Sequence, residues 1–219
     1  MAVGFVQGID VSSNQGKVDW SGVSQADVSF AFARATIGGH QTDSQFAVNW
    51  SGMSDAGLVR GAYHYFWPLT AWQGQANNFV AAIGKLHSGD LPPALDLEEA
   101  IVKSDPQKHD VWNDVLPDQR LPMILNWLRA VEQALGMKPV IYTRQNFIEN
   151  LLGDGIQQLT DSLLWIAHYG VLQPNVPANW ASWTFWQNTD GGTINGVTGK
   201  VDLDNFNGSA NDLRAFTKS

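Results

Sequence analysis

Two carboxylates lie two positions apart in an apolar segment, PALDLEE, at residues 93–99. Side chains at alternate positions of a β-strand point to the same face, so Asp96 and Glu98 are predicted to share one space while Glu99 faces away from it. Burying a charge is costly unless it is paired or hydrogen-bonded, so a chemical role is the better explanation for this pair. Because adjacent carboxylates oppose each other's ionisation, one of them is expected to keep a proton at neutral pH. Glycoside hydrolysis requires such a division of roles.

Three further acids fall in predicted strands near the two ends of the chain. Asp10 closes a strand predicted over residues 5–11, while Asp202 and Asp204 lie in a strand predicted over residues 200–206. In a closed barrel the first and last strands are neighbours, and the catalytic groups lie at the carboxyl ends of the strands. Asp10 and Asp202 are therefore predicted to flank one side of a site whose acid pair comes from the fourth strand.

The elements that must position these acids alternate along most of the chain. Short β-branched, apolar or aromatic runs predict eight strands, at residues 5–11, 28–35, 59–66, 93–98, 138–143, 163–168, 183–187 and 200–206. Helical patterns lie between the early strands, at residues 20–26, 44–56, 71–87, 119–135 and 145–152. After the sixth strand the connections carry prolines or glycines and cannot hold a helix of ordinary length.

Alternating strands and helices predict an α/β fold with a parallel sheet, and eight strands suggest a closed barrel. With five helices for eight strands, the prediction is an irregular TIM-like barrel: five β/α units followed by three strands. We expect one domain over residues 1–219, which is near the lower end for such barrels. The glycine-rich run 191–199 is predicted to be a turn or hairpin and not a phosphate loop, because it lacks the strand-to-helix context.

Composition narrows the partners of this domain. The net charge of −8 and the lack of a basic run argue against nucleic acid or an anionic membrane as the main partner. The absence of cysteine excludes disulfides and thiolate metal sites. Ten Trp, ten Phe and four Tyr are more suggestive, because aromatic faces stack on sugar rings, although most of them are expected in the core. No cofactor is expected, and we expect a monomer.

Several ordered motifs together resemble glycoside hydrolase family 25, the lysozymes that cleave peptidoglycan as N-acetylmuramidases. The resemblance runs from Gly8 to about Phe206, and its motifs are GIDVSSNQG (8–16), VDW (18–20), GAYHYF (61–66), PALDLE (93–98), PVIY (139–142), LWIA (164–167), WQ (186–187) and VDLD (201–204). It implies a flattened barrel with five β/α units and three strands. It also implies that Glu98 is the catalytic acid, that Asp96 is its partner, and that Asp10 and Asp202 are further acids of the site.

The sequence departs from the family pattern at the end of the second predicted strand. Many members end the second strand with Glu-Gly, whereas this chain reads TIGGH at residues 36–40, which puts one substrate contact in doubt. Aromatic residues at strand ends are candidates for sugar platforms. With the two acids of the first and last strands, the predicted substrate-binding residues are Asp10, Asp202, Tyr63, Tyr65, Tyr142 and Trp186. His64, between two of these tyrosines, can equally be a satisfied core histidine that points to the opposite face.

Each of these acids could instead have a purely structural role. Asp96 and Glu98 can form an internal ion pair with Arg34 or another cation, and Asp10 can accept hydrogen bonds from the turn at residues 12–15. For Asp202 a structural role is as well supported as a functional one. A calcium site built on the alternating aspartates is rejected, because Phe206 stands where an oxygen ligand is needed and no Glu follows at the right distance. No metal site is expected.

The predicted reaction is hydrolysis of the β-1,4 bond between N-acetylmuramic acid and N-acetylglucosamine in bacterial peptidoglycan. Asp96 is too close to Glu98 along one strand to be an opposed nucleophile, so the 2-acetamido group of the substrate is the expected nucleophile, oriented by Asp96. The sequence is also compatible with an inverting mechanism in which Asp10 or Asp202 is the general base that activates water.

Two other functions are compatible with the sequence. A chitinase-like N-acetylglucosaminidase would use the same acid pair, and a non-catalytic saccharide-binding barrel would be expected to have lost an acid. The first residues lack the charged start and apolar run of a signal peptide. We therefore expect a protein that acts extracellularly on the bacterial cell wall, either a secreted mature form or a phage-encoded lysin.

Overall fold

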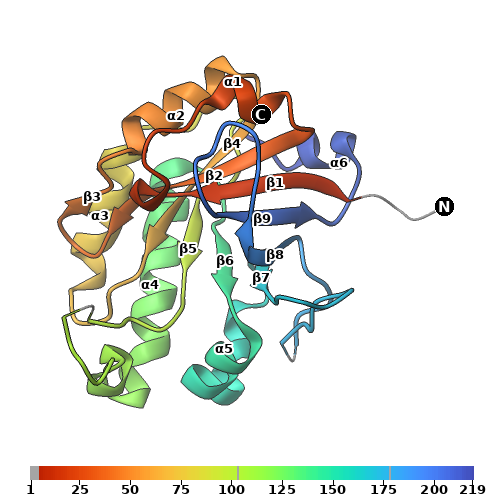
Figure 1. Cartoon of the computed structure of the whole chain (residues 1–219). Helices are drawn as coiled ribbons and strands as arrows, with labels where there is room; N and C mark the ends of the chain where they lie inside the picture. The colour runs from red at the N-terminus through yellow and green to blue at the C-terminus, as the bar shows by residue number, and fades with distance from the viewer. Residues whose placement is uncertain (1–4, 103, 178) are drawn as a thin grey trace.

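A computed structural model describes residues 5–102, 104–177 and 179–219, and these form a closed barrel (Figure 1). The sheet order is β1-β9-β8-β7-β6-β5-β4-β2-β3, and an additional pairing of β1 with β2 closes the ring. Strand β3, a two-residue strand paired with β2, lies outside the ring of eight. The predicted irregular α/β barrel is confirmed.

The strands agree with the eight predicted segments to within a few residues, except that β8 is extended by five residues and β3 was not predicted. Their bounds are β1 Val6–Val11, β2 Val28–Ile37, β3 Gln41–Thr42, β4 Val59–Tyr65, β5 Ala94–Asp96, β6 Val140–Thr143, β7 Leu164–Ala167, β8 Phe185–Gly192 and β9 Val201–Phe206. The glycine-rich run predicted as a hairpin begins in the end of β8 and connects β8 to β9.

Five helices follow the first five strands of the ring, as predicted, and no α-helix lies between β7 and β9 in the described residues. Their bounds are α1 Trp20–Ser24, α2 Phe46–Asp55, α3 Trp72–Ile83, α4 Pro117–Leu135 and α5 Gln145–Leu152, with short 3₁₀ helices at Ser13–Gln15, Val111–Asp114 and Gly153–Leu159. A sixth helix, α6 (Ala210–Ala215), was not predicted. Its capping box, in which Ser209 and Asp212 cap each other, is a signal that the sequence contained.

The parallel sheet predicted from the alternation needs one correction, because the last strand is antiparallel. Strand β9 runs antiparallel to both β8 and β1, and its register places Asp202 directly opposite Asp10. A hairpin connection reverses the chain, whereas a helix crossover would have kept it parallel. As a result Asp202 enters the site from the beginning of β9, while Asp10 enters from the end of β1.

Side chains fill the barrel in two layers, one inside the ring and one between the ring and its helices. Bulky rings occupy the inside, among them Phe30, Phe32 and Trp165, and the Phe32 and Trp165 rings stack at 4.5 Å. Glycines make room for them: a Cβ on Gly61 would lie 2.3 Å from the Phe32 ring. The outer layer packs apolar helix faces against the strands.

Helix α4 shows how the outer layer is formed. The apolar residues predicted for its inner face, Ile124, Trp127, Leu128, Val131 and Leu135, are all buried. The helix ends at Gly136, whose left-handed backbone (φ 70°) suits glycine. In the residues that the structure describes, no helix has the length and apolar content needed to cross a membrane.

Candidate active site

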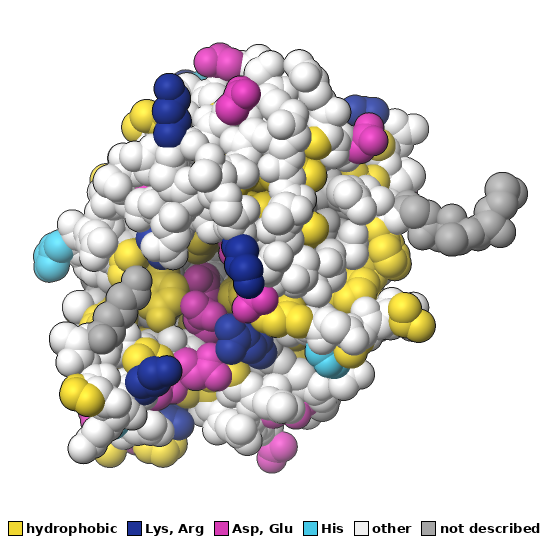
Figure 2. Space-filling view, in the orientation of Figure 1, with side chains coloured by type: hydrophobic (Ala, Val, Ile, Leu, Met, Phe, Trp, Pro, Cys, Tyr) yellow, Lys and Arg dark blue, Asp and Glu magenta, His cyan; other side chains and the backbone are white. Residues whose placement is uncertain are grey.

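Most of the acids singled out from the sequence meet in one pocket at the carboxyl end of the barrel. The pocket has a volume of about 230 Å³, and Figure 2 shows a hollow in the surface with clustered acidic side chains. Its walls include Asp10, Asp96, Glu98 and Asp202, with Tyr63, Tyr65, Tyr142, Trp165, Tyr169, Arg34 and Arg144 around them. The first four come from β1, the end of β5 and the start of β9, which agrees with the predicted arrangement.

The acid pair lies where β5 ends. Asp96 is the last residue of the strand and Glu98 follows two positions later, beyond the strand itself, yet both line the pocket. Burial raises the pKa of Asp96 well above its usual range, and the charge of Glu98 adds to the effect. Burial also raises the pKa of Glu98, to about 7, against the opposing effect of Arg144. The pair therefore retains a proton near neutral pH, as a general acid requires.

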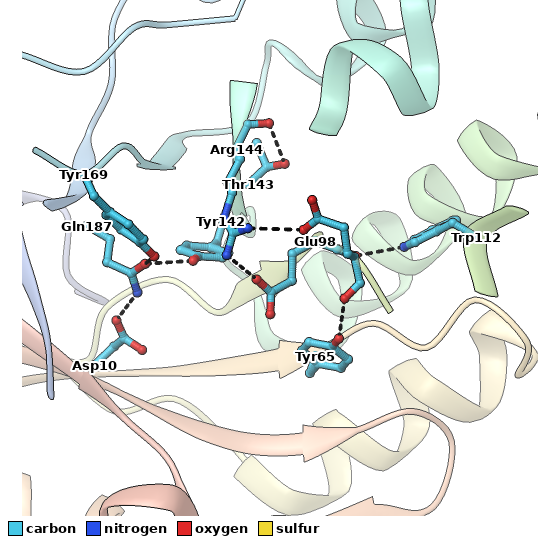
Figure 3. Close-up of polar contacts among 10 residues, drawn as sticks. Asp10, Tyr65, Glu98, Trp112, Tyr142, Thr143, Arg144, Tyr169 and Gln187 are labelled. Carbon is cyan, nitrogen blue, oxygen red and sulfur yellow. Dashed lines mark hydrogen bonds and ion pairs between the residues drawn. The ribbon is translucent and has the colours of Figure 1, made fainter. Parts of the chain in front are cut away.

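Arg144, directly after β6, is the cation closest to the acid pair. Its Nη2 lies 3.4 Å from Oε2 of Glu98 and its Nη1 lies 3.4 Å from Oε2 of Glu99 (Figure 3). Glu99 does not line the pocket, as predicted, but it shares this arginine with Glu98. The backbone around the pair is also held, because Trp112 donates to the carbonyl of Glu98 and Tyr65 donates to the carbonyl of Glu99.

Asp10 is held by an amide on β8. Nε2 of Gln187 donates to Oδ2 of Asp10 at 2.6 Å, and Oε1 of Gln187 accepts from the hydroxyls of Tyr142 at 2.8 Å and Tyr169 at 2.5 Å (Figure 3). Burial raises the pKa of Asp10 well above its usual range, with help from the charge of Asp204. One glutamine thus fixes an acid and two phenols on the same wall.

Asp202 and Asp204 differ in position along β9. Asp202 lines the pocket, and partial burial raises its pKa to about 6, with a contribution from Asp190. Asp204 is fully buried beneath the pocket and accepts a hydrogen bond from Nε1 of Trp165 at 2.8 Å. Burial raises the pKa of Asp204 to about 7. Asp204 does not line the pocket, but the indole it holds belongs to Trp165, which does.

The tyrosines and histidine of β4 separate as alternation predicts. Tyr63 and Tyr65 line the pocket, while His64 points outward into the core. There His64 contacts Thr36 through Nδ1 at 2.7 Å and Gln75 through Nε2 at 3.0 Å, and it stacks on Trp127 at 5.3 Å. Burial lowers its pKa to about 4, so this histidine is neutral at physiological pH.

Trp186 is the one predicted binding residue that the structure does not bring into the pocket. Its ring is buried in the outer layer beside Trp183, and its Nε1 donates to the carbonyl of His168 at 2.8 Å. The difference has a simple cause, because Trp186 and Gln187 are adjacent in β8 and adjacent strand residues face opposite sides. Gln187 has the inward position.

An ion pair of the acid pair with Arg34 or another cation was the structural alternative, and the cation found beside Glu98 is Arg144 and not Arg34. Arg34 lines the pocket, but it pairs with Asp43 at 2.8 Å and donates to the hydroxyl of Ser13. No ion pair joins Arg34 to Asp96 or Glu98 in the described residues. Within the departing segment at residues 36–40, Thr36 is buried and contacts His64.

Residues that sequence reasoning missed include Gln187, Arg144 and Tyr169. Gln187 had a signal in the WQ motif, where alternation should have favoured the glutamine over the tryptophan. Arg144 follows the PVIY strand at the carboxyl end of β6, where barrel sites lie. Tyr169 lies in a connection without regular structure, so its position could not be read from a pattern. Among the described residues no group of His, Asp or Glu forms a candidate metal site.

The arrangement can perform acid-catalysed cleavage of a glycosidic bond. A protonated carboxyl and a second buried acid lie in one pocket, and aromatic side chains line the walls where a sugar ring can pack. These features define the class of protein as a glycoside hydrolase.

Comparison with known proteins identifies the family. The sequence pattern described as "Glycosyl hydrolases family 25" matches residues 9–197. "Lysozyme M1" of Streptomyces globisporus is 35% identical over 218 residues, covering 98% of this chain and 72% of the relative. The N,O-diacetylmuramidase of Chalaropsis sp is 29% identical, covering 90% of this chain and 96% of the relative. The chain belongs to glycosyl hydrolase family 25 and is a glycoside hydrolase of the lysozyme class.

Solved structures agree with this assignment. The bacterial lysozyme of Streptomyces coelicolor superposes with a TM-score of 0.89 at 34% identity, covering 98% of each chain. A family GH25 lysozyme from Aspergillus fumigatus superposes with a TM-score of 0.85 at 28% identity, covering 99% of this chain and 100% of the other. The irregular barrel is therefore shared with bacterial and fungal relatives.

Proposed function

We propose that this family 25 enzyme hydrolyses the β-1,4 bond between N-acetylmuramic acid and N-acetylglucosamine in bacterial peptidoglycan by substrate-assisted catalysis. The observation that carries the proposal is the placement of Asp96 and Glu98. Both enter one pocket from the end of a single strand, two residues apart. Two such acids approach a sugar from the same side, so neither is opposed to the other across the ring. The nucleophile is then best supplied by the substrate.

The proposed reaction has two steps. Glu98 donates its proton to the glycosidic oxygen, the bond from that oxygen to the anomeric carbon breaks, and the carbonyl oxygen of the 2-acetamido group bonds to the anomeric carbon. The resulting oxazolinium ring is then opened by water, whose proton passes to Glu98 as its oxygen bonds to the anomeric carbon. The enzyme returns to its first protonation state, and the product keeps its configuration.

Asp96 is assigned to the acetamido group. Its Oδ1 is buried and has no hydrogen-bond partner among the described residues, so it is available to accept from the acetamido N–H. A hydrogen bond to the charged form of a carboxyl favours that form. Substrate binding would thus ionise Asp96 and leave the shared proton on Glu98, where the first step needs it. Charged Asp96 also stabilises the positive ring.

The remaining walls are assigned to substrate binding. Asp10 and Asp202 lie opposite each other on β1 and β9, and Tyr63, Tyr65 and Tyr142 line the same pocket. Carboxylates and phenols can accept and donate hydrogen bonds to sugar hydroxyls, while phenol rings pack on the apolar face. A binding role for Trp186 is not proposed, because its ring lies in the outer layer.

The test compares peptidoglycan with its muramic acid either N-acetylated or de-N-acetylated. Because de-N-acetylation removes the proposed nucleophile and leaves every protein group intact, cleavage measured by release of reducing ends should slow by at least 10²-fold, comparable to loss of a catalytic group. Cleavage of both substrates at similar rates would contradict the mechanism. Chitin oligomers serve as the second arm, and faster cleavage of chitin than of peptidoglycan would contradict the substrate assignment.

A further inference from the structure

Arg144 has longer contacts than the other arginine–aspartate ion pairs of the described residues. Arg34 pairs with Asp43 at 2.8 Å, and Arg60 pairs with Asp90 at 2.7 Å. These are the lengths expected of strong charge-assisted hydrogen bonds. Arg144 instead lies 3.4 Å from a carboxylate oxygen of Glu98 and 3.4 Å from one of Glu99. Neither glutamate has a close bond to the guanidinium.

The position of Arg144 makes this sharing possible. It follows the last residue of β6 and precedes α5, so its backbone is set by two elements. Its side chain lines both the catalytic pocket and a neighbouring cavity of about 540 Å³, and Glu99 lines only the latter of these two. The buried Nε of Arg144 has no hydrogen-bond partner among the described residues, so the two terminal nitrogens make its side-chain contacts with acids.

We propose that Arg144 and Glu99 form a positioning pair for the catalytic acid, in which Arg144 holds the Glu98 carboxyl in the pocket and Glu99 draws Arg144 away from a close ion pair with it. The inference rests on the proposed role of Glu98 as acid. A close bond, like that between Arg34 and Asp43, would favour the charged form of Glu98 and deprive the reaction of its proton. Without any cation, the carboxyl would be free to turn away and would release its proton less readily.

The other charged side chains around Glu98 come from β2, β5 and β9 and do not explain why Arg144 is shared. Arg34 is held by Asp43, and Asp96 and Asp202 are acids that repel the Glu98 charge. The titratable and charged groups that face Glu98 are Arg34, Tyr65, Asp96, Glu99, Tyr142, Arg144 and Asp202. Of these, only Arg144 is within ion-pair distance of Glu98 in the described residues. Burial raises the Glu98 pKa while Arg144 lowers it and Glu99 raises it, which agrees with the opposed roles.

The experiment measures kcat/KM against pH for Arg144→Gln, Glu99→Gln and the double variant. Arg144→Gln should move the alkaline limb to higher pH and lower the maximal rate, because Glu98 loses both its cation and its anchor. Glu99→Gln should move the limb to lower pH, because Arg144 can then approach Glu98 fully. Each shift should be about 0.5 to 1 pH unit, reduced by the partial exposure of the arginine. In Arg144→Lys, which keeps a positive charge, the alkaline limb should lie between its positions in the natural protein and in Arg144→Gln.

The double variant separates a shared arginine from simple charge effects. In the Arg144→Gln background, Glu99→Gln should shift the limb by less than half of its shift in the natural protein, because there is no arginine left to release. Lys85→Gln and Asp55→Asn make the same charge changes at exposed residues that line none of the described cavities, and they should leave the limb in place.

The outcomes distinguish this inference from the proposed function. The positioning pair would be overturned if the alkaline limb stayed in place in both single variants. It would also be overturned if the two limb shifts simply added in the double variant. Either result would leave Glu98 as the acid. Full activity of Glu98→Gln would overturn the proposed function itself. If Arg144→Gln unfolds, circular dichroism shows it, and the Glu99→Gln limb shift still decides the case.

Discussion

Individual carboxylates in this pocket hold protons according to how deeply each is buried and which charges adjoin it. Glu98 keeps its proton to about pH 7 because it is buried, even though Arg144 is near. Asp43, in contrast, is held charged by Arg34 and by backbone N–H groups, and its pKa is lowered despite burial. Carboxyl groups of one barrel are thus divided between acid chemistry and structural ion pairing by their partners.

Replacing the catalytic acid tests this division directly. Glu98→Gln keeps the shape and hydrogen-bonding capacity of the side chain but removes the proton donor. Activity on peptidoglycan suspensions should fall by about 10²- to 10⁴-fold, since that is the usual contribution of general acid catalysis. Asp55→Asn, an exposed change away from the pocket, is the control and should retain full activity. More than about a tenth of natural activity in Glu98→Gln would remove Glu98 from its role.

The pH dependence of kcat/KM is a second test of the role of Glu98. Loss of the Glu98 proton should set the alkaline limb of kcat/KM, near pH 7 in the free enzyme. The two acids are close enough for the charge of Glu98 to raise the pKa of Asp96. Asp96→Asn takes away the second carboxyl of this pair, so Glu98 should ionise more readily and the limb of the remaining activity should move to lower pH. A limb that stays in place would show that the two acids are not electrostatically coupled.

Strands position the acids because large rings fill the barrel and small residues face them. Gly61 on β4 leaves space for the Phe32 ring of β2, and Gly8 on β1 leaves space for Phe30. An added methyl group on Gly61 would force this interior apart. Gly74 in α3 is the matched contrast, because the nearest atom to its added Cβ is 3.9 Å away.

Two alanine substitutions should therefore have opposite effects on the free energy of unfolding. Gly61→Ala is expected to destabilise by about 1–3 kcal/mol through overpacking. Gly74→Ala, in a helix with open space, should stabilise by about 0.5–1 kcal/mol because alanine is the better helix former. Urea denaturation measures both. Equal stability of the two variants would show that the barrel interior has room that the ring contacts do not indicate.

Much of this arrangement could be predicted because it depends on local patterns. The eight ring strands, the five helices and the absence of an α-helix between β7 and β9 in the described residues follow from periodicity and from the positions of proline and glycine. The direction of the last strand was missed, although the hairpin predicted at residues 191–199 implies an antiparallel strand, because the alternation of strands and helices was extended to the whole sheet. Trp186 was predicted as a binding residue in place of Gln187, although alternation along β8 directs these adjacent side chains to opposite faces. Arg144 was missed because its pairing partners, Glu98 and Glu99, come from the segment after another strand.

Across the whole molecule, several acids with raised pKa values make stability depend on pH in an unusual direction. Asp10, Asp96, Glu98, Asp202 and Asp204 all have pKa values above their ordinary range, chiefly through burial. Between about pH 5 and pH 8 the unfolded chain has already released these protons, whereas the folded protein still binds some of them. These five acids bind more protons in the folded state, so their combined contribution to the free energy of unfolding falls as pH rises. Buried His64, whose pKa is lowered to about 4, contributes in the opposite direction up to its ordinary pKa of 6.5, but it is one group against five.

Urea denaturation at pH 5 and pH 8 measures this dependence. The protein should be less stable at pH 8, because the buried acids are then forced to ionise. Glu98→Gln should recover part of the lost stability at pH 8 and change little at pH 5, where Glu98 is protonated in the folded protein. Such a gain would show that the site is maintained at a cost to stability. Stability that rises from pH 5 to pH 8 would contradict the raised pKa values.

The configuration of the first product distinguishes attack by the acetamido group from direct attack by water. Soluble glycan fragments of peptidoglycan are digested in an NMR tube, and the anomeric signal of the newly formed muramic acid end is followed before mutarotation. Attack by the acetamido group followed by water displaces the anomeric substituent twice, so the account predicts that the β-anomer appears first and the α-anomer only later. Initial appearance of the α-anomer would show a single displacement by water, with Asp10 or Asp202 as base, and would contradict the assignment of Asp96 and Glu98.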